Sequence, residues 1–492
     1  MNRALLRLSM ACLAMFVLLL INVNYVQAFE SSSLADKPGN IRIFNQQFQY
    51  QRGPILAVGD GSDVKIAQSR LIKGNNGIYR RYYPYGAAYA PVTGYDSIYG
   101  TSGIEEAENK ELSGTDPRLE VHNLISMITG KPKLGATVSL TISPRAQQAA
   151  YKALANDGGH QGAVVALNPS TGAILAMASF PTFNPNRYAT LSGSRLKSID
   201  NSYRADPSQP LLNRALQVTY PPGSTFKIIT SSAAYSTHRV ANPNSTVYAP
   251  TQLSLGNGHV LINDDNEVCG DGKPPIIQAF WLSCNTAFGS LGMKVTGPVL
   301  HRYADAYGYN NPGQTIPLTV APSAFPHVTD PALTAYSAIG QFDDQVTPLE
   351  EAMMAATVAN HGTLMTPYLV QRVQAPDLSV IQGAAPKIMS RPVTPTVAGY
   401  LAQMMKQVTQ NPAGTAYATA NASVAGVQIA GKTGTAQNGI NNTNLDDAVF
   451  TCFAPANDPK IAVGVIVKGG GFGADAAAPI AVQVIRAYLG LS

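Results

Sequence analysis

Tyr220-Pro221-Pro222-Gly223-Ser224-Thr225-Phe226-Lys227 and the following IITSSAAYS (residues 228–236) form the most informative segment of this chain. A turn-forming cluster precedes apolar residues at helical spacing, which predicts a helix that begins at Ser224. The N-terminus of a helix favours developing negative charge, and Lys227 lies on the same helix face as the Ser224 hydroxyl. Lys227 can take the serine proton if burial and a second cation lower its pKa. The stretch therefore predicts an activated serine.

Spacing alone does not identify such a serine, because the chain also places Ser62 before Lys65 and Ser194 before Lys197. Both pairs lie in polar stretches that no apolar helix follows. We expect these two serines on solvated loops or hairpins.

Two further motifs, Ser283-Cys284-Asn285 and Lys432-Thr433-Gly434-Thr435, follow in the sequence. The first lies between the apolar segments 279–282 and 286–293 and predicts a turn between helices, although such a motif is also typical of an ordinary polar helix cap. The second follows the alternating Val427 and Ile429, which indicates a strand, and Gly434 would let a substrate backbone lie against it. Lys432 is the candidate for the second cation near Lys227.

Residues 426–433, GVQIAGKT, also fit the phosphate-binding pattern G-x-x-x-x-G-K-[ST]. That pattern needs a helix after the glycine loop, so that the helix N-terminus can hold phosphate. Here the segment looks extended and GTAQNGINN follows it, so we regard nucleotide binding as the weaker interpretation.

The chain also contains Gln51-Arg52-Gly53 with Ile55, Tyr83-Pro84, Val92-Thr93-Gly94-Tyr95, residues 162–177 and Gly340-Gln341 with Val346-Thr347-Pro348. With these segments and the three motifs in this order, the chain resembles the class B penicillin-binding proteins, most closely the compact penicillin-binding protein A type of actinobacteria. The resemblance covers nearly the whole length. The chain departs from many relatives by having Cys284, rather than aspartate, in the middle motif.

The patterning predicts an α/β (α+β) catalytic domain with a five-stranded, mainly antiparallel sheet flanked by helices, and a largely helical insert between its strands. The expected strands are 163–167, 173–178, 427–433, 449–453 and 461–467, and the helix 477–489 should cover one face. The resemblance implies the serine-penicillin-recognising transpeptidase fold with an all-helical subdomain. It implies three parts: a membrane anchor (1–29), a mixed, strand-rich, dimerisation-like pedestal domain (30–136) and a transpeptidase domain (137–492).

The resemblance further implies acyl transfer to Ser224 from the D-alanyl-D-alanine end of a peptidoglycan stem peptide, and covalent inhibition by β-lactams. Lys227 would deprotonate Ser224, Ser283 would pass a proton to the leaving amine, and Asn285 would orient the peptide amide. Lys432, Thr433, Gly434 and Thr435 would bind the substrate and its carboxylate. The backbone N–H groups of Ser224 and Thr435 would form the oxyanion hole. No metal or organic cofactor is needed.

Two other classes of function stay open. A serine β-lactamase or D,D-carboxypeptidase would use the same motifs but hydrolyse its acyl-enzyme, and a non-catalytic cell-wall scaffold would not need Ser224. For the transpeptidase, a separate glycan polymerase and divisome or elongation proteins are the expected partners.

Composition agrees with an exported enzyme of more than one domain. The chain has 492 residues, of which 45% are hydrophobic and 13% charged, with a net charge of +5. No basic run recommends nucleic acid as a partner. The histidines and acid pairs such as Asp264-Asp265 lack metal-ligand spacing, so we expect these acids at the surface or at caps.

Arg3 and Arg7 precede an apolar run from Leu8 that continues to Phe29. The run is compatible with a cleaved signal peptide and with an uncleaved anchor, and the resemblance favours the anchor. In either case the bulk of the chain is exported, as a single-span protein of the cell membrane with an extracytoplasmic catalytic domain.

Export makes disulfides possible, and the chain has four cysteines. Cys12 lies in the apolar run and Cys452 in an expected core strand. Cys269 and Cys284 remain as a plausible pair, with two separate buried thiols as the alternative.

Overall fold

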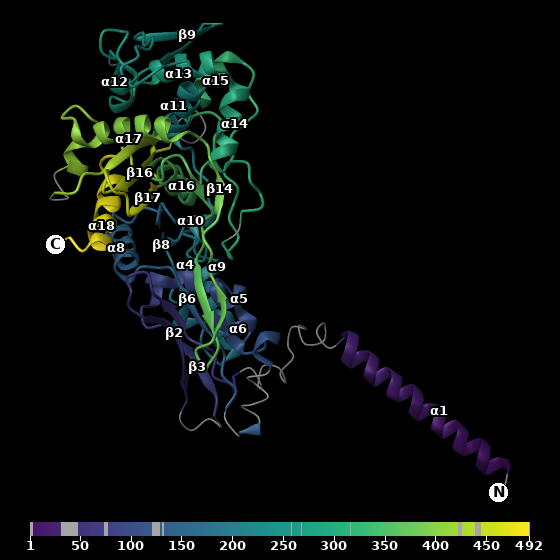
Figure 1. The fold of residues 1–492 in the computed structure, drawn as a ribbon. Coiled ribbons are helices and arrows are strands. Elements are labelled where there is room, and N and C mark those ends of the chain that lie inside the picture. The colour runs from purple at the N-terminus through teal and green to yellow at the C-terminus, as the bar shows by residue number, and fades with distance from the viewer. Residues whose placement is uncertain are drawn as a thin grey trace.

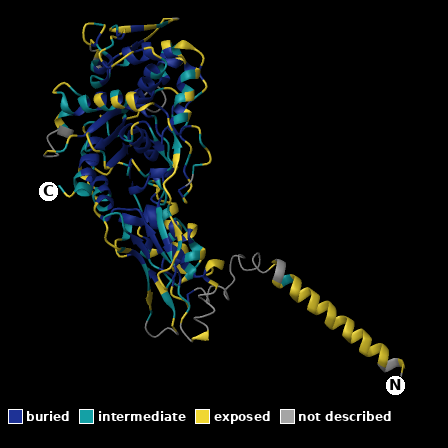
Figure 2. Ribbon diagram, in the orientation of Figure 1, coloured by how far each residue is buried: buried dark blue, intermediate teal, exposed yellow. Residues whose placement is uncertain are grey.

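The computed structural model describes residues 3–30, 48–72, 77–120, 128–129, 132–256, 258–266, 268–314, 316–421, 426–437 and 444–491. Helix α1 (Arg3–Tyr25) is exposed over residues 6–25 (Figure 2). Its segment Leu6–Tyr25, 20 residues long, is long and apolar enough to cross a membrane.

The central element is an antiparallel sheet with the strand order β15-β16-β17-β7-β8. Strands β7 and β8 form the expected hairpin around residues 168–172, and the other three strands come from the C-terminal end of the chain. The prediction of a five-stranded antiparallel sheet built from both ends of the catalytic region is therefore confirmed, although β15 starts at Ala430, three residues later than expected. The bounds are β7 (Gly162–Leu167), β8 (Ile174–Phe180), β15 (Ala430–Ala436), β16 (Asp447–Ala454) and β17 (Ile461–Val467).

Helices cover this sheet (Figure 1). The C-terminal α18 (Ala477–Leu489) packs with α8 (Pro144–Ala155) against it, as the sequence predicted for residues 477–489. Helix α16 (Pro348–Ala359) packs on β17, where an added Cβ at Gly464 would lie 2.5 Å from the nitrogen of Ala352. Gly464 therefore allows the backbone of α16 to approach the sheet closely.

The insert between β8 and β15 is mainly helical. It also contains the hairpin β9 (Gln252–Gly256) and β10 (His259–Ile262), so the expectation of an all-helical subdomain needs this correction. Its helices are α9 (Gly193–Arg204), α10 (Arg214–Gln217), α11 (Lys227–Ser236), α12 (Ile276–Trp281), α13 (Asn285–Val295), α14 (Gly297–Tyr307), α15 (Pro331–Ser337) and α17 (Pro395–Gln410).

A second sheet, with the order β13-β12-β6-β1-β2-β3, organises the N-terminal region. Its first three strands in the sequence are β1 (Ile55–Ala57), β2 (Val64–Leu71) and β3 (Tyr79–Tyr82). β6 (Thr137–Leu140), β12 (Val370–Gln374) and β13 (Val380–Gly383) complete it from much later in the chain. One continuous apolar core runs from this region into the five-stranded sheet. The remaining short elements are α4 (Ala90–Thr93), β4 (Asp96–Ser97), β5 (Gly100–Thr101), α5 (Ile104–Ala107), α6 (Asn109–Ser113), β11 (Leu364–Met365) and β14 (Ile388–Ser390).

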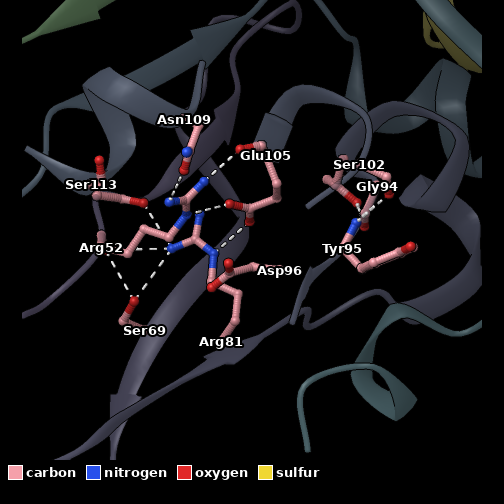
Figure 3. A network of polar contacts seen from close by, with 12 residues as sticks. Arg52, Ser69, Arg81, Gly94, Tyr95, Asp96, Ser102, Glu105, Asn109 and Ser113 are labelled. Carbon is pink, nitrogen blue, oxygen red and sulfur yellow. Dashed lines mark hydrogen bonds and ion pairs between the residues drawn. The ribbon is translucent and has the colours of Figure 1, made fainter. Parts of the chain in front are cut away.

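A buried ionic network holds the N-terminal region together (Figure 3). The carboxylate of Glu105 on α5 accepts from Arg52 Nε at 2.6 Å and from Arg81 Nε at 2.5 Å. Arg52 also donates to Asn109 on α6 at 2.7 Å. Burial works to raise the pKa of Glu105, but the charges of Arg81 and Arg52 prevail and lower it. The carboxylate thus joins β3, α5 and the segment before β1.

Candidate active site

Ser224 lies in a short turn that packs closely against the backbone of two other segments, at Gly340 and at Thr435. Its turn, Gly223–Phe226, is a 3-10 turn, and the α-helix α11 begins only at Lys227, so the prediction of a helix that starts at Ser224 was one turn early. The Gly223 N–H donates to the carbonyl of Gly340 at 3.0 Å. Gly223 has φ +55°, and an added Cβ there would lie 2.8 Å from the carbonyl oxygen of Thr435. Glycine at 223 therefore brings the serine turn against β15.

Lys227 is fully buried and lies at the centre of the polar contacts. Its Nζ donates to Ser224 Oγ at 2.9 Å, to the carbonyl of Ser283 at 2.6 Å and to Asn285 Oδ1 at 2.8 Å. Burial lowers the pKa of Lys227 to about 7, against the opposing charge of Asp264. The lysine is therefore poised to exchange a proton near neutral pH.

The second motif forms the turn between α12 and α13. Ser283 has φ +61°, and its Oγ accepts from Lys432 Nζ at 2.8 Å. Asn285 is the first residue of α13, and its Nδ2 donates to Asp264 Oδ1 at 3.0 Å. Asp264, which the sequence placed at the surface or at a cap, thus contacts a motif residue; no spacing in the sequence indicated this contact.

The third motif lies on β15. Lys432 is fully buried and also donates to the carbonyl of Thr433 at 3.0 Å. Burial and then the charge of Lys227 lower the pKa of Lys432 well below its usual range. Burial is thus the leading cause of the lowered pKa of both lysines, and the repulsion between their ammonium groups favours loss of a proton from the pair.

Thr433, Gly434 and Thr435 continue this strand past the serine turn. Thr433 Oγ1 lies 2.7 Å from Thr415 Oγ1, and the carbonyl of Thr435 accepts from Gln341 Nε2 at 3.5 Å. An added Cβ at Gly434 would lie 2.7 Å from the carbonyl oxygen of Pro222. The close approach at Gly434 is therefore to the chain's own serine turn, where the sequence analysis expected a substrate backbone.

The phosphate-loop interpretation fails on this geometry. Residues 430–436 form one continuous strand paired with β16, so residues 434–436, directly after Thr433, are extended and do not begin a helix. Among the described residues, no group of three or more His, Cys, Asp or Glu side chains could hold a metal ion.

Cys269 and Cys284 form a disulfide with a Cα–Cα distance of 5.9 Å, which confirms the predicted pair. Cys284 lies between Ser283 and Asn285, so the bond attaches the middle motif to the loop that follows Asp264. Cys12 and Cys452 are free thiols.

Comparison with known proteins identifies the family. Residues 162–486 match the model of the penicillin-binding protein transpeptidase domain, and residues 52–138 match that of the penicillin-binding protein A dimerisation domain. The chain belongs to the penicillin-binding protein transpeptidase family. A peptidoglycan D,D-transpeptidase PbpA of Mycolicibacterium smegmatis is 40% identical over 99% of both chains, and the PbpA of Mycobacterium tuberculosis is 38% identical over the same shares.

Solved structures of this family agree in fold. The ceftriaxone acyl-enzyme complex of penicillin-binding protein A from M. tuberculosis superposes with a TM-score of 0.84, at 38% identity over 90% of this chain and 99% of that one. The penicillin G acyl-enzyme complex of the same protein gives 0.82, at 38% identity over 89% of this chain and 100% of that one. The family and its transpeptidase fold are thus as the sequence resemblance implied.

Proposed function

We propose that this penicillin-binding protein is a peptidoglycan D,D-transpeptidase that forms its acyl-enzyme at Ser224. The observation that carries the proposal is the contact of Ser224 Oγ with Lys227 Nζ at 2.9 Å, with the pKa of the buried lysine lowered to about 7. A neutral lysine at that distance can accept the hydroxyl proton as the oxygen attacks.

In the first step, Ser224 Oγ attacks the carbonyl carbon between the last two D-alanines of a stem peptide, and its proton passes to Lys227. The oxyanion accepts from the backbone N–H groups of Ser224 and Thr435. The C–N bond then breaks, the amine of the terminal D-alanine takes a proton through Ser283, and the ester remains. Single oxyanion-hole donors in other enzymes lower the barrier by about 3 kcal/mol each.

In the second step, an amine of a neighbouring stem peptide attacks the ester and restores the Ser224 hydroxyl. Lys432, Thr433 and Thr435 bind the substrate carboxylate beside Gly434, and Asn285 orients the peptide amide. The contact of Lys432 Nζ with Ser283 Oγ at 2.8 Å supports the role of Lys432. From this position one ammonium group can bind the substrate carboxylate and donate to the serine that relays the proton.

The remaining parts serve this reaction. Residues 1–29 anchor the enzyme in the cell membrane through α1, with Arg3 and Arg7 on the cytoplasmic side and residues 137–492 outside as the transpeptidase domain. Residues 30–136, with strands β6, β12 and β13 added to their sheet, form the pedestal. The pedestal presents a surface to a separate glycan polymerase, which supplies the strands to be cross-linked, and to divisome or elongation proteins.

Covalent labelling by penicillin tests the proposal. A β-lactam presents a strained amide and a carboxylate, and its expelled amine stays tethered, so one whole drug molecule should remain on the peptide that contains Ser224. Ser224→Ala should gain no mass, whereas Ser194→Ala, a serine of the same spacing outside the site, should label like the wild type. Absence of labelling in folded wild-type protein would overturn the proposal, and rapid release of the drug would indicate a β-lactamase.

A further inference from the structure

A buried glutamic acid contacts the residue that follows the proposed nucleophile. Thr225 and Glu351 are both fully buried, and Thr225 Oγ1 lies 2.7 Å from Glu351 Oε1. The same Thr225 oxygen lies 2.8 Å from the carbonyl oxygen of Pro222. Glu351 belongs to α16, the helix that packs on the sheet at Gly464. The three groups form a chain of hydrogen bonds from α16 to the serine turn.

The direction of this chain depends on whether Glu351 carries a proton. A hydroxyl carries one proton, and a carbonyl oxygen can only accept. If Thr225 donates to Pro222, the proton between Thr225 and Glu351 must belong to Glu351. The second oxygen, Glu351 Oε2, is buried and has no hydrogen-bond partner within the described part of the chain. If Glu351 were ionised, leaving this buried oxygen without a donor would cost much free energy, because the oxygen would carry negative charge. The cost is smaller for the neutral acid.

The surroundings of Glu351 also favour the neutral acid. Burial raises the pKa of Glu351 to about 8, and the bond to Thr225 acts only partly against this. The titratable groups that interact with it are Glu350 on the same helix and Tyr309 after α14, which also interacts with Asp344 before α16. Burial, and then the charge of Glu351, raises the pKa of Tyr309 and of Glu350. No lysine, arginine or histidine among the described residues forms an ion pair with Glu351.

The chain of bonds reaches the reacting groups through backbone contacts. The Pro222 carbonyl oxygen and Thr225 Cγ2 lie 2.7 Å and 3.2 Å from the position that a Cβ of Gly434 would occupy. We propose that protonated Glu351 is a positioning residue, which donates to Thr225, so that Thr225 holds the Pro222 carbonyl and aligns Ser224 with β15. This inference rests on the proposed function of Ser224. When Glu351 ionises, the Thr225 hydroxyl turns to the carboxylate, the Pro222 carbonyl loses its donor, and acylation slows.

The test is the pH profile of acylation by a fluorescent penicillin, resolved into the dissociation constant of the drug and the first-order acylation rate constant. Between pH 6 and 9.5 the wild-type rate constant should rise and then fall above the pKa of about 8 to a plateau about tenfold lower, with the dissociation constant unchanged. Glu351→Gln keeps a hydrogen-bond donor that does not titrate, so the acylation rate constant of this variant should not fall at alkaline pH. The matched control Glu350→Gln alters the neighbouring buried acid and should keep the wild-type profile.

Substitutions of Thr225, which joins Glu351 to the Pro222 carbonyl, complete the test. Thr225→Val, which leaves α16 unchanged, should lower the acylation rate constant about tenfold below pH 8 and remove the alkaline fall, and Thr225→Ser should restore the wild-type profile. An alkaline fall in Glu351→Gln equal to that of the wild type, or a wild-type rate in Thr225→Val, would overturn the inference. Wild-type protein that never acylates would instead remove the proposed function, so the two failures are distinguishable.

Discussion

The ammonium groups of Lys227 and Lys432 converge on one hydroxyl, since Ser283 Oγ lies 3.3 Å from Lys227 Nζ and 2.8 Å from Lys432 Nζ. Both lysines are fully buried, so neither charge is screened by water. Two cations held at one oxygen favour the loss of a proton from the pair. The arrangement therefore favours a neutral Lys227 beside Ser224, and no carboxylate is needed to take up the proton.

The first prediction is the acidic limb of the pH profile. The pKa of Lys227 is lowered to about 7, so the lysine is charged below that pH and cannot accept the Ser224 proton. The acylation rate constant should therefore fall about tenfold per pH unit below 7 and approach its maximum between pH 7 and 8. Stopped-flow measurement with penicillin checks this, and a rate independent of pH between 5 and 7 would contradict the role of Lys227 as base.

The second prediction concerns Lys432→Ala. Loss of this ammonium group removes the proposed carboxylate ligand and the donor to Ser283, and should lower acylation efficiency about 100-fold. Lys460→Ala, at an exposed lysine, is the control and should label normally. Specific binding of ATP or GTP by the wild type, lost in Lys432→Ala, would instead revive the phosphate-loop interpretation.

The third prediction concerns the disulfide. Cys269→Ser with Cys284→Ser opens the loop that the bond closes, and should lower the free energy of unfolding by about 3 kcal/mol. Acylation should slow as well, because Ser283 and Asn285 flank Cys284 and lose their attachment. Denaturant titration and penicillin kinetics measure the two effects. Mass analysis of unreduced fragments that found both thiols free would refute the bond.

The fourth prediction concerns the buried network of Figure 3. Glu105→Gln removes the charge that compensates Arg52 and Arg81, both buried, and should lower the free energy of unfolding by about 3–5 kcal/mol. Asp458→Asn, which breaks an exposed pair with Lys460, should leave stability nearly unchanged. Equal effects of the two changes in denaturant titration would contradict a structural role for the network.

Local sequence was sufficient for much of this protein. The strands of the five-stranded sheet, the terminal helix 477–489 and the three motifs each depend on residues within a few positions of one another, so periodicity and turn chemistry predicted them. The pairing of Cys269 with Cys284 could be predicted because the chain has only four cysteines, and Cys12 and Cys452 were assigned to other segments. The start of the α-helix at Lys227 was missed, because the close packing of Gly223 against Gly340 and Thr435, rather than local propensity, determines that turn.

Sequence motifs were enough to predict the candidate catalytic residues: a serine with a lysine one turn away, a Ser-x-Asn turn and a Lys-Thr-Gly strand in a fixed order. Tertiary structure alone decided that Asp264 reaches Asn285, that β12 and β13 join the N-terminal sheet, and that Glu351 meets Thr225. The reason is physical. These contacts join residues far apart in the chain, and neither hydrophobic period nor turn propensity carries information about a partner outside its own segment.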